Sequence, residues 1–386
     1  MKTPTYLYFP LEEYQERLQQ LRTRMEAKGV DVMLIHTPEN LYYMSGYQTP
    51  GYYWYQTLAV PLDKEPVFIT RLIEDSNVQA LSWVEDSRPY EDSDDWVAKT
   101  KDALVDLGMA DKRIGVEKES WFLTVGDYER LCATMPSAQW VDCSGLVEQG
   151  RMIKSPQEIE YMRQAAEAAE AGMRAGIEAC RVGATENEVA AEIHSVQIKT
   201  GSEYTGLPIF ISAGPRSALA HATWYRQELQ PGWTVFLEIP GCIHRYHAAM
   251  MRCVYLGEPT ELLLKAAEVM ATALEKTITY IKPGVSAEEA YEVCRRTIDD
   301  SSIGVKLAQR AAYSIGIGFA PDWGEGYIIS MKKGEKRPLQ KGMTFHLIPL
   351  VFLKGIAAIG VTETILVTEN GCESLTPNVE RRLFAK

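Results

Sequence analysis

The sequence lacks three features that would assign a protein to a class directly: a long apolar run, a paired-cysteine motif and a basic stretch. No span reaches the ~18 apolar residues of a membrane-spanning helix. The seven cysteines are scattered and form no Cys-x-x-Cys, which argues against a disulfide framework and a zinc knuckle. Acidic residues outnumber basic ones by 52 to 40, and no long Lys/Arg run offers a basic face for phosphates. We therefore expect neither a membrane nor a nucleic-acid partner.

The beginning of the chain also lacks a secretion pattern. The residues after Met1 lead directly into a polar helix, without a charged region followed by an apolar stretch. Together with the scattered cysteines, this favours a reducing compartment, and we expect a cytoplasmic protein. The length of 386 residues fits two domains, and 46% hydrophobic residues can supply a sizeable core.

The first part of the chain has the pattern of an α/β domain. Residues 11–28 have apolar side chains at helical spacing, and Gly29 supplies a stop signal. Strand-like stretches follow at 30–36, 57–60 and 66–70, and helices are expected near 95–107 and 124–133. We place this domain at residues 1–147.

A capping box marks the start of the second domain, which we place at residues 148–386. Ser155 can cap a helix, Pro156 suits its first position, and Glu158 can reach back to the cap. A long helix should therefore run from this point to about Cys180.

The second domain contains an internal repetition. Two further capping boxes, Thr185 with Glu188 and Ser286 with Glu289, each open an amphipathic helix that follows a long helix. Apolar stretches at 234–239, 248–255, 343–352 and 362–368 read as strands. The repetition predicts an α+β duplication, in which two helix pairs pack on one curved antiparallel sheet.

Four segments of this domain carry a family resemblance. Residues 151–158, 282–286, 342–345 and 364–371 resemble, in order and in spacing, the creatinase/prolidase/methionine-aminopeptidase superfamily. Residues 41–46 resemble the N-terminal domain of creatinases and prolidases more loosely. The resemblance implies a pita-bread catalytic domain at 148–386.

Peptidases of this superfamily bind two metal ions through two Asp, one His and two Glu. The resemblance places at those five positions Glu238, Ala249, Ile315, Ile348 and Thr362. Four of the five cannot ligate as a metallopeptidase requires. Shifting the comparison by one residue, to Glu363, does not restore a ligand, because neighbouring strand positions point to opposite faces. We expect no metal and no other cofactor.

The polar residues that remain resemble the metal-free branch of the superfamily. Residues 220–224 resemble the place where creatinase carries its catalytic histidine, which is His221 here. The runs 236–247, 321–325, 345–346 and 361–363, and the tail 382–386, resemble ectoine hydrolase, which opens a cyclic amidine without a metal. The run 48–55 departs from that pattern in its order and lacks an expected acidic residue, which leaves the substrate open.

Two residues are candidate catalysts. Glu238 lies in an apolar strand, where an unpaired carboxylate is costly. We expect it to orient or deprotonate water or to attack the amidinium carbon, the alternative being a buried ion pair with Arg252. His221 can both accept and supply the proton that a leaving nitrogen needs.

The candidate substrate-binding residues are histidines, carboxylates and aromatic side chains. His247 and His346 can face one pocket or be hydrogen-bonded core residues. Glu363 and Glu325 can contact the positive end of a ligand or a neighbouring Arg, and Glu117 is either a strand-end residue or a pocket residue at a subunit interface. Aromatic faces bind delocalised cations, although such residues are more often core; the candidates are Trp323, Trp224, Tyr47 and Trp54.

Three functions agree with these residues. The first is a metal-independent hydrolase of a C–N bond in a small zwitterion, with ring opening of ectoine to N-acetyl-2,4-diaminobutyrate as the leading case. The amidinium carbon is already electrophilic, so a carboxylate and an imidazole suffice. The alternatives are a creatinase-like amidinohydrolase acting on a guanidino compound and a non-catalytic binding module. The resemblance also implies a homodimer in which the N-terminal domain of one subunit helps to close the pocket of the other.

Overall fold

The computed structural model describes residues 4–386, which form two compact units. The first unit ends at Arg151, and the second extends from Met152 to Lys386. The predicted boundary before residue 148 lies earlier, at the start of helix α6 (Glu148–Arg151), which is the last element of the first unit. The expectation about the start of the chain rests partly on residues 1–3, which lie outside the described residues. Among residues 4–386, no helix combines the length and the apolar character needed to cross a membrane.

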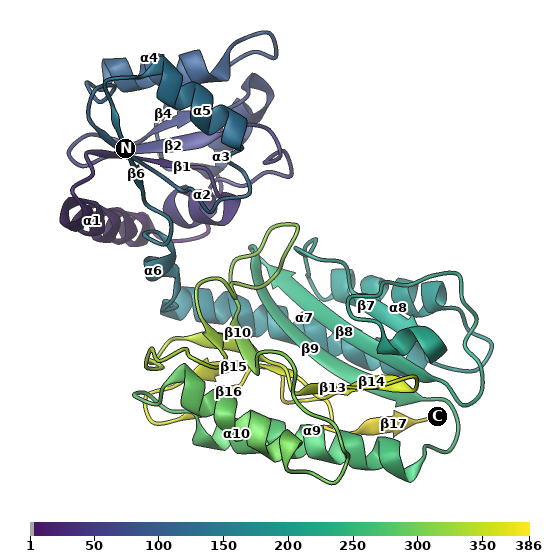
Figure 1. Cartoon of the computed structure of the whole chain (residues 1–386). Helices are drawn as coiled ribbons and strands as arrows, with labels where there is room; N and C mark the ends of the chain where they lie inside the picture. The colour runs from purple at the N-terminus through teal and green to yellow at the C-terminus, as the bar shows by residue number, and fades with distance from the viewer. Residues whose placement is uncertain (1–3) are drawn as a thin grey trace. The chain divides into compact units, whose positions relative to one another are not determined.

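The first unit is a six-stranded mixed sheet with helices on both of its sides (Figure 1). The strand order is β4-β3-β2-β1-β5-β6, and β1 runs parallel to β5 but antiparallel to β2. The strands are β1 (Val32–Ile35), β2 (Thr57–Pro61), β3 (Val67–Ile69), β4 (Asp86–Ser87), β5 (Arg113–Val116) and β6 (Gln139–Asp142). The helices before α6 are α1 (Leu11–Lys28), α2 (Pro38–Ser45), the 3₁₀ helix η1 (Leu72–Glu74), α3 (Asp75–Leu81), α4 (Trp96–Asp106) and α5 (Val125–Thr134).

The α/β prediction for this unit is confirmed element by element. Helix α1 has the predicted bounds, and Gly29 ends it with a left-handed φ of 67°, which a side chain would disfavour. All four residues of β1 are buried at the centre of the sheet.

The second unit has two helix pairs, on opposite sides of its sheets in Figure 1. The predicted capping boxes at Ser155, Thr185 and Ser286 are all formed. The helices are α7 (Pro156–Ala179), α8 (Glu186–Lys199), the 3₁₀ helix η2 (Gly214–Ala218), α9 (Glu261–Tyr280) and α10 (Ala287–Asp299). The duplicated arrangement of a long and a shorter helix is therefore confirmed.

The strands of the second unit form a four-stranded sheet, β17-β9-β8-β7, a five-stranded sheet, β11-β10-β12-β15-β16, and the hairpin β13-β14. Every pairing is antiparallel except that of β17 with β9. The strands are β7 (Phe210–Ala213), β8 (Thr234–Ile243), β9 (Tyr246–Tyr255), β10 (Ala312–Ser314), β11 (Ser330–Met331), β12 (Thr344–Leu347), β13 (Leu350–Leu353), β14 (Ala357–Gly360), β15 (Glu363–Val367), β16 (Cys372–Ser374) and β17 (Leu383–Ala385). The single strand predicted at 343–352 is wrong: β12 and β13 are separate, with Pro349, which has no N–H for a ladder, between them.

Helices α7 and α8 cover one face of the four-stranded sheet and leave the other for the site. Met173 and Ile193 of these helices share one buried cluster with Leu237 and Ile239 of β8. Close packing of α7 requires Gly241, because a Cβ there would lie 2.0 Å from the Ala165 carbonyl oxygen.

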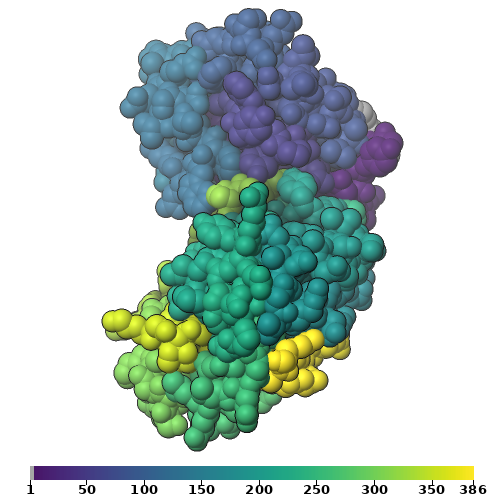
Figure 2. Space-filling view, turned by 90° about the vertical axis from the view of Figure 1, so that its right-hand side faces the viewer, coloured from purple at the N-terminus to yellow at the C-terminus, as the bar shows by residue number. Residues whose placement is uncertain are grey.

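The C-terminal residues of the chain lie against the C-terminal end of α7. Figure 2 shows them in yellow beside teal segments of the second unit. The Lys386 ammonium lies 2.7 Å from Glu178 near the end of α7, and β17 pairs with β9.

Candidate functional site

Glu238 forms the centre of the candidate site. Its neighbours Leu237 and Ile239 face the helix-covered core, so strand alternation turns Glu238 to the opposite face. The strand register places it beside Phe210 of β7 and Met251 of β9. The residue retains an exposed fraction of only 9%.

The Glu238 carboxyl has no hydrogen-bond or ion-pair partner within residues 4–386. Burial raises its pKa to about 8, with a smaller contribution from the negative charge of Asp322. The alternative of an ion pair with Arg252 is wrong, because Arg252 lies opposite Leu237 in the register and shares its face. A largely protonated carboxyl therefore occupies this position in the free protein near neutral pH.

A chain of four hydrogen-bonded side chains crosses the neighbouring strands. The Trp323 indole N–H donates to the Tyr313 hydroxyl oxygen at 2.8 Å. The hydroxyl lies 2.8 Å from His346 Nδ1, and His346 Nε2 lies 2.7 Å from Thr362 Oγ1. The indole only donates, so the Tyr313 oxygen is an acceptor in the first bond, and each ring nitrogen of His346 has one hydroxyl partner. Burial, followed by the charge of Arg310, lowers the His346 pKa to about 3, so the ring is neutral.

The strand pairing joins this chain to Glu238. Tyr313 lies opposite His346, while Met251 pairs with both Glu238 and Thr362. Burial and the nearby Glu238 charge both raise the pKa of the Tyr313 phenol. We call Glu238, Tyr313, His346, Thr362 and Trp323 the Glu238 cluster.

His221 lies at the exposed edge of this cluster. Its backbone is left-handed, with φ 55°, and its ring centre lies 5.3 Å from that of Phe210. The same Phe210 ring lies 5.3 Å from Trp323. Half-buried Asp322 completes the edge, and burial raises its pKa whereas the charges of Arg310 and His221 lower it. Phe210 thus links His221 to Trp323 and, through the strand register, to Glu238, and Tyr313 links Trp323 to His346.

His247 lies in the sheet but both of its ring nitrogens have protein partners. The Gly206 N–H donates to Nε2 at 3.0 Å, so Nδ1 carries the proton and donates to the Arg245 carbonyl at 2.9 Å. Burial, followed by the charge of Arg245, lowers its pKa to about 3. His247 therefore fixes the loop at Gly206 and has no ring nitrogen left for a substrate, which corrects its assignment as a substrate-binding residue.

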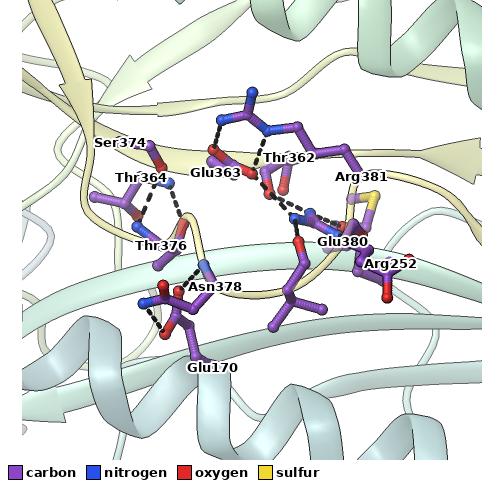
Figure 3. Close-up of polar contacts among 12 residues, drawn as sticks. Glu170, Arg252, Thr362, Glu363, Thr364, Ser374, Thr376, Asn378, Glu380 and Arg381 are labelled. Atoms are coloured by element: carbon purple, nitrogen blue, oxygen red, sulfur yellow. Dashed lines mark hydrogen bonds and ion pairs between the residues drawn. The ribbon is translucent and has the colours of Figure 1, made fainter.

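Glu363 requires the same correction. It follows Thr362 directly in the chain, and alternation turns it to the opposite face of β15. There its carboxylate accepts hydrogen bonds from Arg252 at 3.0 Å and from Arg381 at 2.8 and 2.7 Å (Figure 3). Its charge is neutralised by the protein.

Two other predicted binding residues of the second unit also have structural partners. The buried Glu325 carboxylate lies 2.7 Å from the buried Lys154 ammonium. Trp224 packs on the cluster of α7, α8 and the helix-covered sheet face, where its ring centre lies 5.8 Å from that of His194. It therefore lies on the wrong side of the sheet to form a wall with Trp323.

The three predicted residues of the first unit differ in their exposure. Tyr47 is buried, with its hydroxyl donating to Gln56 at 3.0 Å and its ring beside Phe68. Glu117 is buried as well and accepts the backbone N–H groups of His36 and Thr37 at the start of α2; burial raises its pKa to about 7. Trp54 is 41% exposed, and the Arg71 guanidinium lies 4.6 Å from its ring centre.

Sequence reasoning did not assign a role to Tyr313, Thr362, Asp322 or Phe210. The strand pairing places Tyr313 directly opposite His346, and Thr362 lies two residues before Thr364, the partner of His346 in β15. The pairing itself is a tertiary property, so the sequence alone did not supply it.

The residues present do not fit the two-metal site of the superfamily peptidases. The side chains of Ala249, Ile315 and Ile348 carry no ligand atom, and the Thr362 hydroxyl is already hydrogen-bonded to His346 Nε2. Within residues 4–386 there is no group of three or more His, Cys, Asp or Glu side chains arranged to hold a metal ion. Glu238 is the remaining potential ligand among the five positions.

Comparison with known proteins defines the family. Residues 160–369 match the sequence pattern of metallopeptidase family M24, and residues 17–153 match that of the creatinase/prolidase N-terminal domain. An ectoine hydrolase of Halomonas elongata is 32% identical over 98% of this chain and 99% of its own length. An Xaa-Pro dipeptidase of Lactobacillus delbrueckii is 27% identical over 93% of this chain and 96% of its own.

Solved structures share the fold of the whole chain. An Xaa-Pro dipeptidase of Bacillus anthracis superposes with a TM-score of 0.82 at 23% identity, covering 97% of this chain and 100% of that one. A prolidase of Thermococcus sibiricus gives a TM-score of 0.87 at 20% identity, covering 97% and 99%. The predicted pita-bread domain with a creatinase/prolidase-like N-terminal domain is thus confirmed.

We predict that Glu238 titrates near pH 8 in the free protein. The infrared band of a protonated carboxyl group should disappear as the pH rises through about 8, and the difference between wild type and Glu238→Gln isolates it from other carboxyl groups. The folded pKa lies above the ordinary 4.5, so this group stabilises the fold below that value and loses its contribution as the pH rises to about 8. The substitution should remove this part of the pH dependence of unfolding. Identical titrations of the two proteins would contradict the assignment.

Proposed function

We propose that this chain, a hydrolase that belongs to metallopeptidase family M24, opens a C–N bond of a small zwitterion without a metal, with ectoine as the leading substrate. The observation that carries the proposal is the buried, unpartnered Glu238 carboxyl at a position where peptidases of the family hold metal. The identity of 32% with an ectoine hydrolase over 98% of the chain supports the choice of substrate.

The charges and aromatic rings around Glu238 suit a delocalised cation. The buried rings of Phe210 and Trp323 pack against each other beside Glu238, aromatic rings attract planar cations, and Glu238 and Asp322 supply negative charge. A bound amidinium favours the ionised form of Glu238 and lowers its pKa, so the carboxylate forms as the ligand enters. The ligand thus supplies the positive charge that the protein does not place beside this carboxyl.

The hydrolysis requires one base and one acid. Glu238 takes a proton from water as its oxygen adds to the amidinium carbon, and His221 delivers a proton to the ring nitrogen that leaves. The C–N bond breaks, the water oxygen becomes the acetamide oxygen, and both water protons end on the leaving nitrogen, which departs as an ammonium group. If Glu238 instead attacks the carbon and one nitrogen leaves, an imidoyl ester forms on Glu238, and water adds to its carbon in a second step, which releases the acetamide and the carboxylate with the same overall balance.

The neutral His346 has a different task in this scheme. Both of its ring nitrogens are engaged, and its pKa of about 3 excludes it as a proton carrier near neutral pH. Its hydrogen bonds hold the Tyr313 and Thr362 hydroxyl groups in place beside Glu238. A guanidino substrate, which is also a planar cation, would use the same residues.

Turnover of a defined set of solutes tests the substrate proposal. We expect the purified protein to convert ectoine to N-acetyl-2,4-diaminobutyrate, measured by chromatography, and to process creatine or an Xaa-Pro dipeptide far more slowly. Faster turnover of creatine would replace the ectoine assignment by the guanidino one. Hydrolysis of the dipeptide alone would overturn the proposal, and absence of turnover and binding for the whole set would favour a binding module.

The catalytic pair is tested by substitution. Glu238→Gln keeps the shape but removes the base, so we expect kcat to fall by a factor on the order of 10²–10⁴, and similarly for His221→Ala. The two losses should not add in the double variant, because the residues serve one step. His194→Ala, which removes a histidine from the helix-covered side, is the matched control and should keep near-normal kcat. A double variant with near-normal turnover would remove both residues from the mechanism.

We further propose the homodimer implied by the family resemblance, and the surface of the first unit supports it. Four apolar residues in two adjacent pairs are exposed there, with exposed fractions of 74% and 41% for Tyr53 and Trp54 and of 50% and 68% for Leu72 and Ile73. Arg71, which directly precedes Leu72, lies against the Trp54 ring and so brings the two pairs near each other. Exposed apolar residues that lie together are typical of protein contacts. We call these four residues the apolar patch.

Trp54→Ala tests this role. The substitution should raise KM and shift the protein toward the monomer in analytical ultracentrifugation, with an unchanged circular dichroism spectrum. Val105→Ala, at an exposed position on α4 outside the apolar patch, should change neither KM nor the oligomeric state. A wild-type protein that is monomeric and fully active would contradict the dimer.

A further inference from the structure

Arg310 is a half-buried guanidinium with unfilled hydrogen-bonding capacity. Its central carbon lies 4.4 Å from the centre of the Tyr313 ring, and Nη1 donates to Ser330 Oγ at the long distance of 3.3 Å. It has no carboxylate partner within residues 4–386. A guanidinium has five N–H donors and matches a carboxylate with two parallel hydrogen bonds. Arg310 can therefore accept a carboxylate without losing an existing ion pair.

The other arginines that stack on aromatic rings show what is unusual here. Most of them also bind a carboxylate of the protein; these are Arg17, Arg71, Arg130, Arg216 and Arg382. Arg245 lacks one, but it donates to the carbonyl oxygens of Tyr204 and Gly318. Arg310 differs from both kinds, because neither a carboxylate nor a carbonyl group satisfies it.

Two glycines make room for this arrangement. A Cβ on Gly326 would lie 2.2 Å from Arg310 Nη1, and a Cβ on Gly324 would lie 2.7 Å from Tyr313 Cε2. The turn that carries Asp322 and Trp323 thus packs against both the guanidinium and the ring beneath it. Arg310 is held at this place by packing against the turn and not by an ion pair within residues 4–386.

The charge of Arg310 reaches the Glu238 cluster. It contributes to the lowered pKa of His346, and it opposes the effect of burial on the pKa of Tyr313 and of Asp322. The Tyr313 ring lies under the guanidinium and its hydroxyl takes part in the cluster. The site therefore combines a fixed cation at Arg310 with carboxyl groups at Glu238 and Asp322, which is the complement of a zwitterion.

We propose that Arg310 binds the carboxylate of the substrate while Glu238 faces its cationic ring. The inference rests on the proposed function and narrows the substrate class to solutes that carry a carboxylate and a delocalised cation in one small molecule. Arg310 is then a specificity residue, which selects such zwitterions over simple amidinium cations of the same shape.

A pair of ligands that differ in one group tests this inference. Steady-state kinetics compare ectoine with the same methylated ring lacking the carboxylate, and kcat/KM gives a preference ratio for each protein. Wild type should prefer ectoine by a factor on the order of 10–100, the value of a hydrogen-bonded charge pair. Arg310→Gln should reduce this ratio to about one by weakening ectoine alone, whereas Arg310→Lys, which keeps the charge, should restore part of it.

Two further variants separate specificity from folding. Gly326→Ala displaces the guanidinium without removing its charge and should lower the ratio while the fold persists. Arg382→Gln removes a guanidinium that lies 4.3 Å from the Phe384 ring but already binds Glu380, and it should keep the wild-type ratio.

The outcomes distinguish this inference from the proposed function. If wild type hydrolyses ectoine and Arg310→Gln keeps the full preference, or loses both ligands equally, the inference is overturned and the proposed function stands. If wild type neither binds nor hydrolyses either ring, the proposed function fails and the inference fails with it.

Discussion

The buried ion pair between Arg252 and Glu363 is the contact on which the site depends. Arg252 belongs to β9 of the four-stranded sheet and Glu363 to β15 of the five-stranded sheet, and both are fully buried. The guanidinium also donates to the carbonyl oxygens of Met251 and Thr362, the two residues whose bridge joins these sheets. The ion pair, which lies on the opposite face of these strands, therefore fixes the position of Glu238 relative to His346.

A buried ion pair stabilises a fold only when its remaining donors and acceptors are satisfied, because removing two charges from water is costly. The C-terminal tail meets this requirement. The carbonyl oxygens of Val379 and Glu380 accept from Arg252, and Arg381 supplies a second cation to Glu363 (Figure 3). The last residues of the chain thus belong to the support of the site although none of them lies in the Glu238 cluster.

Burial without a counter-charge sets the electrostatics of the sheet face that carries Glu238. The Glu238 carboxyl is buried beside Phe210 and Met251 and loses hydration without gaining a counter-charge from the described residues. Its pKa of about 8 is the direct consequence. A cationic ligand reverses this effect when it enters, so in our account the substrate completes the electrostatics of the site.

Sequence patterns predicted those parts of the molecule that depend on local rules. The capping boxes gave the starts of α7, α8 and α10, and family spacing led to Glu238, His221, His346 and Trp323, which the structure brings together. Glu363 was assigned to the site because residues 361–363 resemble ectoine hydrolase, but the structure turns its side chain to the opposite face, where two arginines bind it. Tyr313 was missed, since its role follows from pairing with a strand 33 residues away. Such pairings are set by tertiary packing and leave no local signal.

Metal content and turnover, measured on one sample, test the central claim most directly. The purified protein is treated with a chelator, its Mn, Fe, Co and Zn are quantified by mass spectrometry, and ectoine hydrolysis is followed before and after treatment. Our account predicts unchanged turnover with metal far below one ion per chain. Stoichiometric metal together with activity that is lost to the chelator and restored by adding the metal back would contradict it.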